Sequence, residues 1–127
     1  MIDLLVIAPH PDDAELGLGG TLARAHSQGL STAVIDLSRG EAATKGTPER
    51  RAEEARAAAR VLGLSERRNL GWPDSRIFDG EHRRLELAHE IRELRPRVVA
   101  APHRNDRHPD HVAAAAIAPA AMHLAGL

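Results

Sequence analysis

The chain has 127 residues, with 17 Lys or Arg against 18 Asp or Glu, and its formal net charge is −1. This length suits a single domain, expected over residues 1–127, with a real hydrophobic core. The balanced charge, the single Trp, the single Phe and the absence of Tyr provide neither the basic field nor the stacking platform of a nucleic-acid-binding protein. The absence of Cys excludes disulfides, thiolate metal sites and cysteine nucleophiles.

No uninterrupted apolar run approaches the roughly 20 residues of a membrane span. The acidic start, Met1-Ile2-Asp3, leads directly into a predicted strand and does not resemble a secretion signal. We therefore expect a cytoplasmic protein that binds neither membranes nor nucleic acid.

The first half of the chain predicts a strand, a helix and a second strand. Residues 3–8 are continuously apolar, as in a parallel strand buried on both faces. A helix follows over residues 15–28 and stops at Gly29, and residues 32–37 form the next strand. Three glycines weaken the first turns of this helix, which predicts that something requires a close approach to its backbone there. They are Gly17, Gly19 and Gly20.

A second helix is indicated by its end signals. Thr47 is a suitable N-cap with Pro48 at the first helical position, and the helix runs to about Leu62 and stops at Gly63. Residues 68–71 form a weak third strand.

The last part of the chain predicts two more helices around a fourth strand. One helix covers residues 81–94 and is followed by Pro96, and residues 97–101 form the strand. The final Ala-rich helix runs from Pro109 to about Leu124. Strands that alternate with helices indicate an α/β fold with a mainly parallel sheet, right-handed crossovers and helices on both faces.

Two polar clusters follow two of the predicted strands. His10-Pro11-Asp12-Asp13 comes directly after the first strand, and His108-Pro109-Asp110-His111 follows the fourth. Parallel strands end at the same edge of a sheet, where ligands bind, so the two clusters could together hold one divalent metal ion. The first and fourth strands must then be neighbours, which predicts the strand order 3-2-1-4.

The spacing within each cluster indicates which side chains share a side. His10 and Asp13 are three residues apart, while Asp12 points elsewhere and stays free to accept a proton. His108 and His111 are also three apart at a helix start. Spacing alone leaves open which histidine of the second pair binds the metal. It also leaves zinc, Fe²⁺, Mn²⁺ and Co²⁺ as candidates, because their ligand preferences overlap.

Further motifs accompany the two clusters along the chain: they are residues 10–15, 39–41, 45–48, the pair Arg51 and Glu54, residues 70–74 and residues 106–111. Together they resemble the LmbE/PIG-L family of zinc-dependent N-acetylglucosaminyl deacetylases. The resemblance covers nearly all of the chain and is greatest to the branch that deacetylates N-acetylglucosaminyl-malate in bacillithiol synthesis. It implies a Rossmann-like three-layer sandwich and an amino-sugar substrate.

The resemblance also implies roles for the residues of the first cluster and one residue of the second. One zinc ion would be bound by His10, Asp13 and His111. Asp12 would be the general base that deprotonates the zinc-bound water. Zinc lowers the pKa of such a water to about 7, so a carboxylate suffices as base.

The remaining implied roles concern the substrate. His108 would act as acid or electrophile over the developing oxyanion and would be oriented by Asp110. Arg51 and Asp106 would lie in the substrate pocket. Members of the family continue with further strands and helices, so this chain is expected to be a C-terminally short form. Apolar residues of its last helix would then be uncovered, which favours a homo-oligomer.

Three functions are compatible with these observations. The first is a zinc amidohydrolase that acts on an N-acetylated amino sugar. The second is a metal-dependent phosphoesterase, although the number of well-placed ligands suits one metal rather than two. The third is a non-catalytic, metal-binding scaffold that self-associates.

Overall fold

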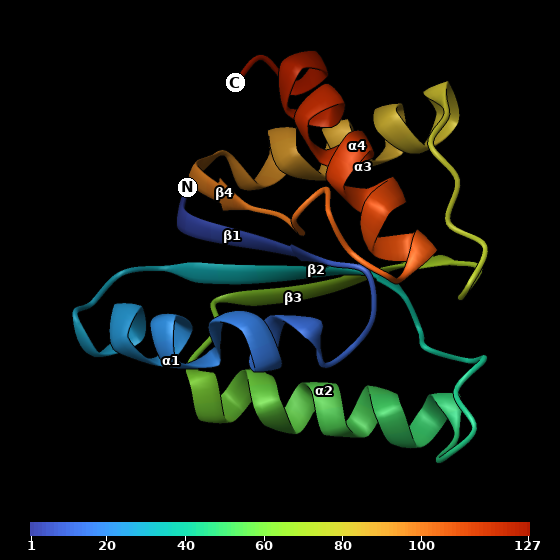
Figure 1. The fold of residues 1–127 in the computed structure, drawn as a ribbon. Helices are drawn as coiled ribbons and strands as arrows, with labels where there is room; N and C mark the ends of the chain where they lie inside the picture. Colours follow the sequence, from blue (N-terminus) through green and yellow to red (C-terminus); the bar gives the residue numbers. More distant parts are fainter.

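Four parallel strands form one sheet between two layers of helices (Figure 1). The computed structural model describes all residues from 1 to 127. The sheet order is β3-β2-β1-β4, which confirms the predicted order and the Rossmann-like α/β fold. The strands are β1 (Ile2–Ala8), β2 (Thr32–Ser38), β3 (Glu66–Trp72) and β4 (Pro96–Ala100). The helices are α1 (Asp13–Ser27), α2 (Pro48–Leu62), α3 (Glu81–Leu94) and α4 (Pro109–Ala125).

The arrangement of the strands follows from their sequences. Every residue of β2 is buried, as expected for a strand inside a parallel sheet. Leu4 of β1 lies beside Thr32 of β2 on one side and beside Val98 of β4 on the other. The carboxyl ends of β1 and β4 are therefore adjacent, and each is followed by one of the polar clusters.

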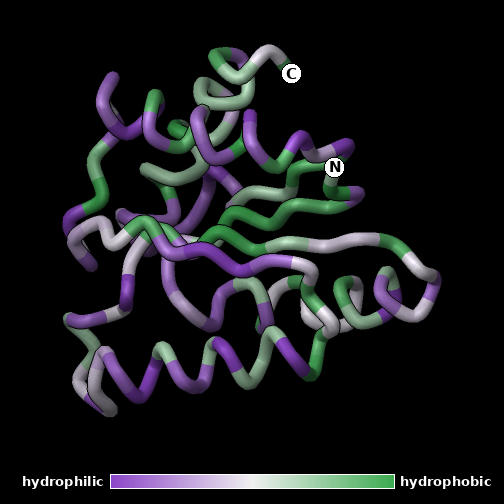
Figure 2. Tube along the Cα trace, turned by 180° about the vertical axis from the view of Figure 1, so that it is seen from behind, coloured by the Kyte–Doolittle hydropathy of each residue, from purple (hydrophilic) through white to green (hydrophobic).

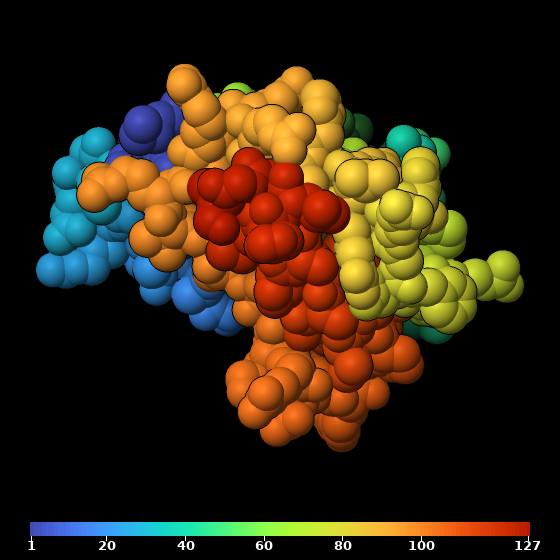
Figure 3. Space-filling view, turned by 90° about the horizontal axis from the view of Figure 1, so that it is seen from above, coloured from blue at the N-terminus to red at the C-terminus, as the bar shows by residue number.

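The two faces of the sheet carry cores of different size. Helices α3 and α4 lie side by side across one face (Figure 3), and the cluster on that side contains 16 buried apolar residues. On the face of α1 the cluster contains five, and α2 has no buried residue at all. Figure 2 shows the contrast between the hydrophobic strands in the middle and the largely hydrophilic α2. Helix α2 must therefore be held by something other than a deep apolar face.

The predicted ends of α2 are confirmed. The Thr47 side chain accepts a hydrogen bond from the Arg50 backbone N–H, which makes Thr47 the N-cap. Gly63 ends the helix with φ +67°, and a Cβ there would lie 2.4 Å from the ring of His26. Glycine is therefore required at this position both for its backbone conformation and for space. None of the four helices is long and apolar enough to span a membrane.

The expected close backbone approach to the start of α1 is wrong. A Cβ placed on Gly17, Gly19 or Gly20 would meet no atom within 4 Å. These positions face open space, and Gly17 lines an apolar cavity on the uncovered side of β1 and β4.

A buried ion pair links the layers around β3. Arg67 donates hydrogen bonds to both carboxylate oxygens of Asp36 on β2, at 2.7 and 3.0 Å. The same guanidinium pairs with Glu15 of α1 and donates to the backbone oxygen of Ala55 in α2. Burial raises the pKa of Asp36 to about 6, against the opposite effect of Arg67. Four elements thus meet at one side chain, which compensates for the lack of buried residues in α2.

Replacing Arg67 with Met should destabilise the fold by about 3 kcal/mol at pH 7.5, because it leaves the Asp36 carboxylate buried and unpaired. Arg68→Met is the matched control on the same strand. Its partners lie nearer the surface, so the loss should be about 1 kcal/mol or less. Urea unfolding measures both variants. At pH 5 the Arg67→Met loss should shrink, because a neutral Asp36 needs no partner. Equal losses in the two variants would contradict this account.

Candidate metal centre

The loops that follow β1 and β4 bring three histidines together. The ring of His10 lies 4.7 Å from that of His108 and 5.5 Å from that of His111, measured between centroids. His108 is the N-cap of α4, and His111 lies in the first turn of that helix. The two clusters predicted to meet therefore do meet, at the adjacent carboxyl ends of the two strands.

One group of ligand atoms converges on the Asp13 carboxylate. His10 Nδ1 lies 3.2 Å from Asp13 Oδ2, and His111 Nε2 lies 3.1 Å from the same oxygen. One ligand atom from each of the three residues lies within 4.8 Å of the other two, close enough to bind one ion. Two imidazole nitrogens and one carboxylate oxygen are a donor set that fits zinc and leaves a coordination position open. These are the residues assigned to zinc from the sequence.

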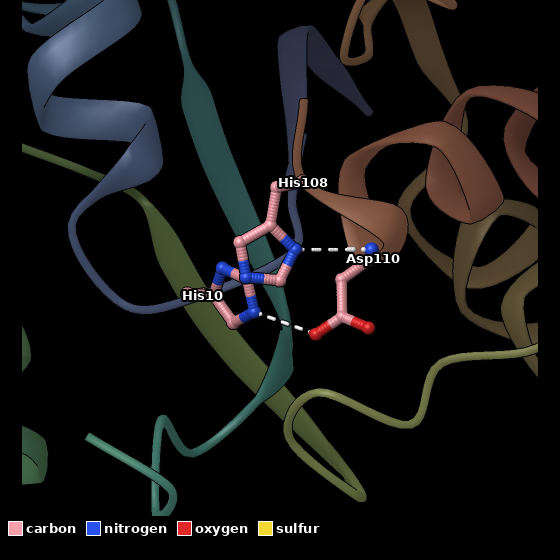
Figure 4. A group of neighbouring side chains, drawn as sticks. All are labelled: His10, His108 and Asp110. Atoms are coloured by element: carbon pink, nitrogen blue, oxygen red, sulfur yellow. Dashed lines mark hydrogen bonds and ion pairs between the residues drawn. The ribbon is translucent and has the colours of Figure 1, made fainter. Parts of the chain in front are cut away.

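The other nitrogen of His10 faces carboxylates. His10 Nε2 donates to Asp110 Oδ2 at 2.8 Å (Figure 4) and lies 3.1 Å from Asp74 Oδ1. The buried Asp110 carboxylate also accepts the backbone N–H groups of Ser75 and Ile77, at 2.8 and 3.1 Å. Asp110 is thus engaged by three donors, and it fixes a proton on Nε2 of His10. The Nδ1 atom is left for a metal, as in sites where a carboxylate orients a metal-binding histidine.

Asp110 contacts His108 through its backbone rather than its carboxylate. The backbone N–H of Asp110 donates to Nδ1 of His108 at 3.0 Å (Figure 4). Because Nδ1 accepts this bond, the proton of the neutral His108 ring sits on Nε2. The backbone of Asp110 thus holds the ring of His108, while the Asp110 side chain holds that of His10.

A second possible metal group combines His10, His108 and Asp110. It needs the Nε2 nitrogen of His10, which the hydrogen bond to Asp110 already occupies. The backbone N–H groups of Ser75 and Ile77 also occupy both oxygens of the Asp110 carboxylate, which leaves fewer lone pairs for a metal ion. The group around Asp13 is therefore the better metal site.

Asp12 is held in a strained backbone conformation with φ +150°, which is rare for any residue other than glycine. It lines a polar cavity of about 330 Å³ together with His10, His108 and Arg51. Burial and the neighbouring Asp13 charge raise the pKa of Asp12 above its usual value. The residue expected to act as base is thus placed beside the metal group without belonging to it.

Arg51 reaches the same cavity from α2. Its Nη2 atom donates to the backbone oxygen of Pro11 at 3.0 Å and lies 3.7 Å from Asp12 Oδ2. Its Nε atom is buried and has no partner. A Cβ at Gly40 would lie 2.7 Å from that atom, so glycine there leaves the room that Arg51 occupies. Arg51 therefore lines the polar cavity with one donor unused, and its expected part in substrate binding stays a prediction.

Asp106 lies away from this cavity. Its carboxylate accepts the backbone N–H of His108 at 2.8 Å and lies 3.1 Å from Nδ1 of His111. Asp106 therefore orients His111, as Asp110 orients His10, and it lines neither the polar cavity nor the apolar one of about 400 Å³ beside Asp13.

The charges of the metal group are strongly coupled. Burial lowers the pKa of His10, but hydrogen bonds with Asp13 and Asp110 outweigh it and raise the value to about 9. Burial raises the pKa of Asp13, yet the His10 hydrogen bond and the charge of His111 bring it below its usual value. The Asp110 pKa is lowered in the same way, against burial, by His10 and two backbone donors. In the metal-free site His10 is therefore protonated at neutral pH, and a metal ion would replace the Nδ1 proton that faces the ionised Asp13.

Sequence reasoning assigned no role to Asp74. Its side chain is buried, faces His10 and accepts the backbone N–H of Ala42 at 2.8 Å, while its own backbone N–H donates to Glu41. Asp74 comes two residues after the end of β3, at the same edge of the sheet. A polar residue after a parallel strand is a candidate site residue, as for the other two clusters. The sequence predicted only a weak, short strand over residues 68–71, so Asp74 was not recognised in this way.

The model of the GlcNAc-PI de-N-acetylase family, PIG-L, matches residues 5–122. The chain therefore belongs to the PIG-L/LmbE family, as its motifs indicated. A diacetylchitobiose deacetylase from Thermococcus kodakarensis is 31% identical over 98% of this chain and 50% of its own length. The chain spans about half the length of several of the curated relatives that it matches.

Solved structures agree with this membership. The conserved protein TT1542 from Thermus thermophilus is 61% identical, with a TM-score of 0.96 over all of this chain and 58% of its own. A 4-carboxy-2-hydroxymuconate hydratase from Pseudomonas putida is 28% identical, with a TM-score of 0.85 over all of this chain and 58% of its own. The fold thus occurs in a protein with a different reaction, so the reaction must be argued from the site.

Replacing His111 with Ala should reduce bound zinc from one ion per chain to nearly none, because one of three ligands is lost. His108→Ala should keep the ion, since His108 lies outside the group around Asp13. His123→Ala, farther along α4, is the matched control. Elemental analysis after dialysis measures all three. Zinc retained by His111→Ala, or lost from His108→Ala, would contradict the ligand assignment.

Proposed function

We propose that this chain forms the metal-binding part of a zinc-dependent N-deacetylase that hydrolyses the acetamido group of an N-acetylglucosaminide. The observation that carries the proposal is the convergence of His10, Asp13 and His111. His10 also lines the polar cavity that contains Asp12 and His108, while Asp13 and His111 line the apolar cavity. The deacetylase relative and the description of the matching family support the same reaction class.

The proposed reaction breaks the amide C–N bond with water and releases acetate and a free amine. A divalent metal held by His10, Asp13 and His111 would polarise the amide carbonyl and make water acidic enough to lose a proton at neutral pH. Asp12 takes the proton from the attacking water, and this proton passes to the leaving amine nitrogen as the C–N bond breaks. His108 donates its Nε2 hydrogen to the developing oxyanion, a role that its fixed tautomer suits.

Arg51 is proposed to bind the substrate. Its buried Nε donor has no protein partner, and an unmade hydrogen bond in a buried place is costly. A sugar hydroxyl or a carboxylate of the group attached to the sugar would satisfy it. N-acetylglucosaminyl-malate, the substrate suggested by the sequence resemblance, offers both, and we propose this class of substrate and a cytoplasmic setting. We propose only an indirect part for Asp106, through His111.

The other candidate functions are less well supported. A two-metal phosphoesterase would need two separate ligand sets, whereas the two possible metal groups share His10. The hydratase relative gives the one specific reason to consider another reaction, because the same base and metal could direct water to a carbon–carbon double bond. A scaffold without turnover stays the alternative if no reaction is found.

Asp12→Asn should retain zinc and lose activity by about 10²–10⁴-fold, because the amide cannot accept a proton but leaves the metal ligands intact. The assay is acetate release from an N-acetylglucosaminide with zinc present. Asp79→Asn, at an exposed ion pair with Arg84, is the matched control and should keep its rate.

Full activity in Asp12→Asn would remove Asp12 from the mechanism. If the unmodified chain binds zinc and releases no acetate, the scaffold function is favoured instead. Consumption of an unsaturated hydroxy acid without acetate release would favour the hydratase function.

We also propose that the chain forms homo-oligomers through the side of β4. Val98 on this edge strand is 58% exposed, and the apolar cavity beside β1 and β4 lies on the same side. Val98→Lys should therefore reduce the mass measured by light scattering to that of a monomer. Val61→Lys, at an 84% exposed position on α2, should leave the mass unchanged. A strictly monomeric unmodified chain at high concentration would contradict the proposal.

A further inference from the structure

A cavity of about 440 Å³ lies between α2 and β3, separate from the metal centre. Its wall includes Pro11, the residue after the metal ligand His10, but it shares no lining residue with the polar cavity. Neither the family membership nor the proposed deacetylation assigns it a role. Five arginines line it: Arg39, Arg56, Arg60, Arg67 and Arg68.

Two of these arginines are already paired. Arg67 is held by Asp36 and Glu15, and Arg68 is held by three glutamates of β3 and α3. The guanidinium groups of Arg39, Arg56 and Arg60 form no hydrogen bond or ion pair with the protein. One lining carboxylate, Asp36, is present, and it is fully used by Arg67. The cavity therefore carries a positive excess in a chain whose net charge is −1.

The sequence of α2 makes the space for this cavity. Ala52, Ala55 and Ala59 recur at helical spacing on the side of α2 that faces β3, and they line the cavity with Arg56 and Arg60. Their small side chains leave α2 without a buried residue and leave room that larger apolar side chains would fill. The result is a cavity lined by alanine methyl groups and by three exposed arginines that have no protein partner.

We propose that this cavity binds a small anion that carries a phosphate group. A phosphate monoester has about two negative charges and three acceptor oxygens at neutral pH, which matches three unpaired guanidinium groups. Guanidinium is the side chain best suited to bidentate contact with phosphate oxygens. The alanine methyl groups offer contact to the rest of the molecule, and Asn69 adds a polar group to the wall.

The test measures inorganic phosphate binding by calorimetry at constant ionic strength, with chloride as the balancing anion. The Arg56→Gln/Arg60→Gln double variant removes two free guanidinium groups from exposed positions on α2. We expect its affinity to fall by about tenfold or more, since each hydrogen bond to a charged group contributes on that scale. The Arg24→Gln/Arg50→Gln variant removes the same charge from exposed arginines outside the cavity and should bind as the unmodified chain does.

Binding must also be independent of the metal, because phosphate can bind a zinc ion. The titration is therefore repeated on metal-free His111→Ala, in which binding should persist. Three results would overturn the proposal: no binding to the unmodified chain, equal losses in the two double variants, or loss of binding in His111→Ala. Unfolding midpoints of both double variants confirm that the fold is intact.

Discussion

The parallel pairing of β1 with β4 is the constraint on which the site depends. The two strands are far apart in the sequence, yet Leu4 lies beside Val98 and Val6 beside Ala100. This register places the carboxyl ends of both strands at one edge of the sheet. The loop that follows β1 therefore contacts the loop that follows β4. The hydrogen bond from His10 to Asp110 spans 100 residues of sequence and exists only because of that register. The candidate metal group, the placement of Asp12 and the polar cavity all follow from this one adjacency.

His10 divides the site into two sides. Its Nε2 atom is held by Asp110, whose own position is set by backbone donors from the segment after β3. Its Nδ1 atom faces Asp13, which His111 approaches from α4. A fixed ring of this kind presents the metal with a ligand that needs little rearrangement, which favours both affinity and geometry. The strained backbone of Asp12, which lies between His10 and Asp13, costs folding free energy. Such strain is typical of functional sites, where it holds a side chain in a required position.

Sequence patterns predicted the elements and the meeting of the two polar clusters, because both depend on local or repeated features. The choice of His10, Asp13 and His111 as metal ligands rests on the family resemblance and stays a prediction. Continuous apolar runs and helix-end residues such as Thr47 and Gly63 act within a few positions. Other features depend on contacts that no local pattern records. The three glycines of α1 indicated a close approach, but the structure has open space there. The roles of Asp74 and of the Asp110 carboxylate depend on where the segment after β3 lies, and spacing could not supply that.

The central claim is that one divalent ion binds on the Nδ1 side of His10. The most direct measurement is a crystal structure of the chain with zinc, with the ion located by anomalous scattering. We expect a single ion within about 2.0–2.2 Å of His10 Nδ1, an Asp13 carboxylate oxygen and His111 Nε2. An ion placed instead between His10 Nε2, His108 and Asp110, or two ions in one chain, would contradict it.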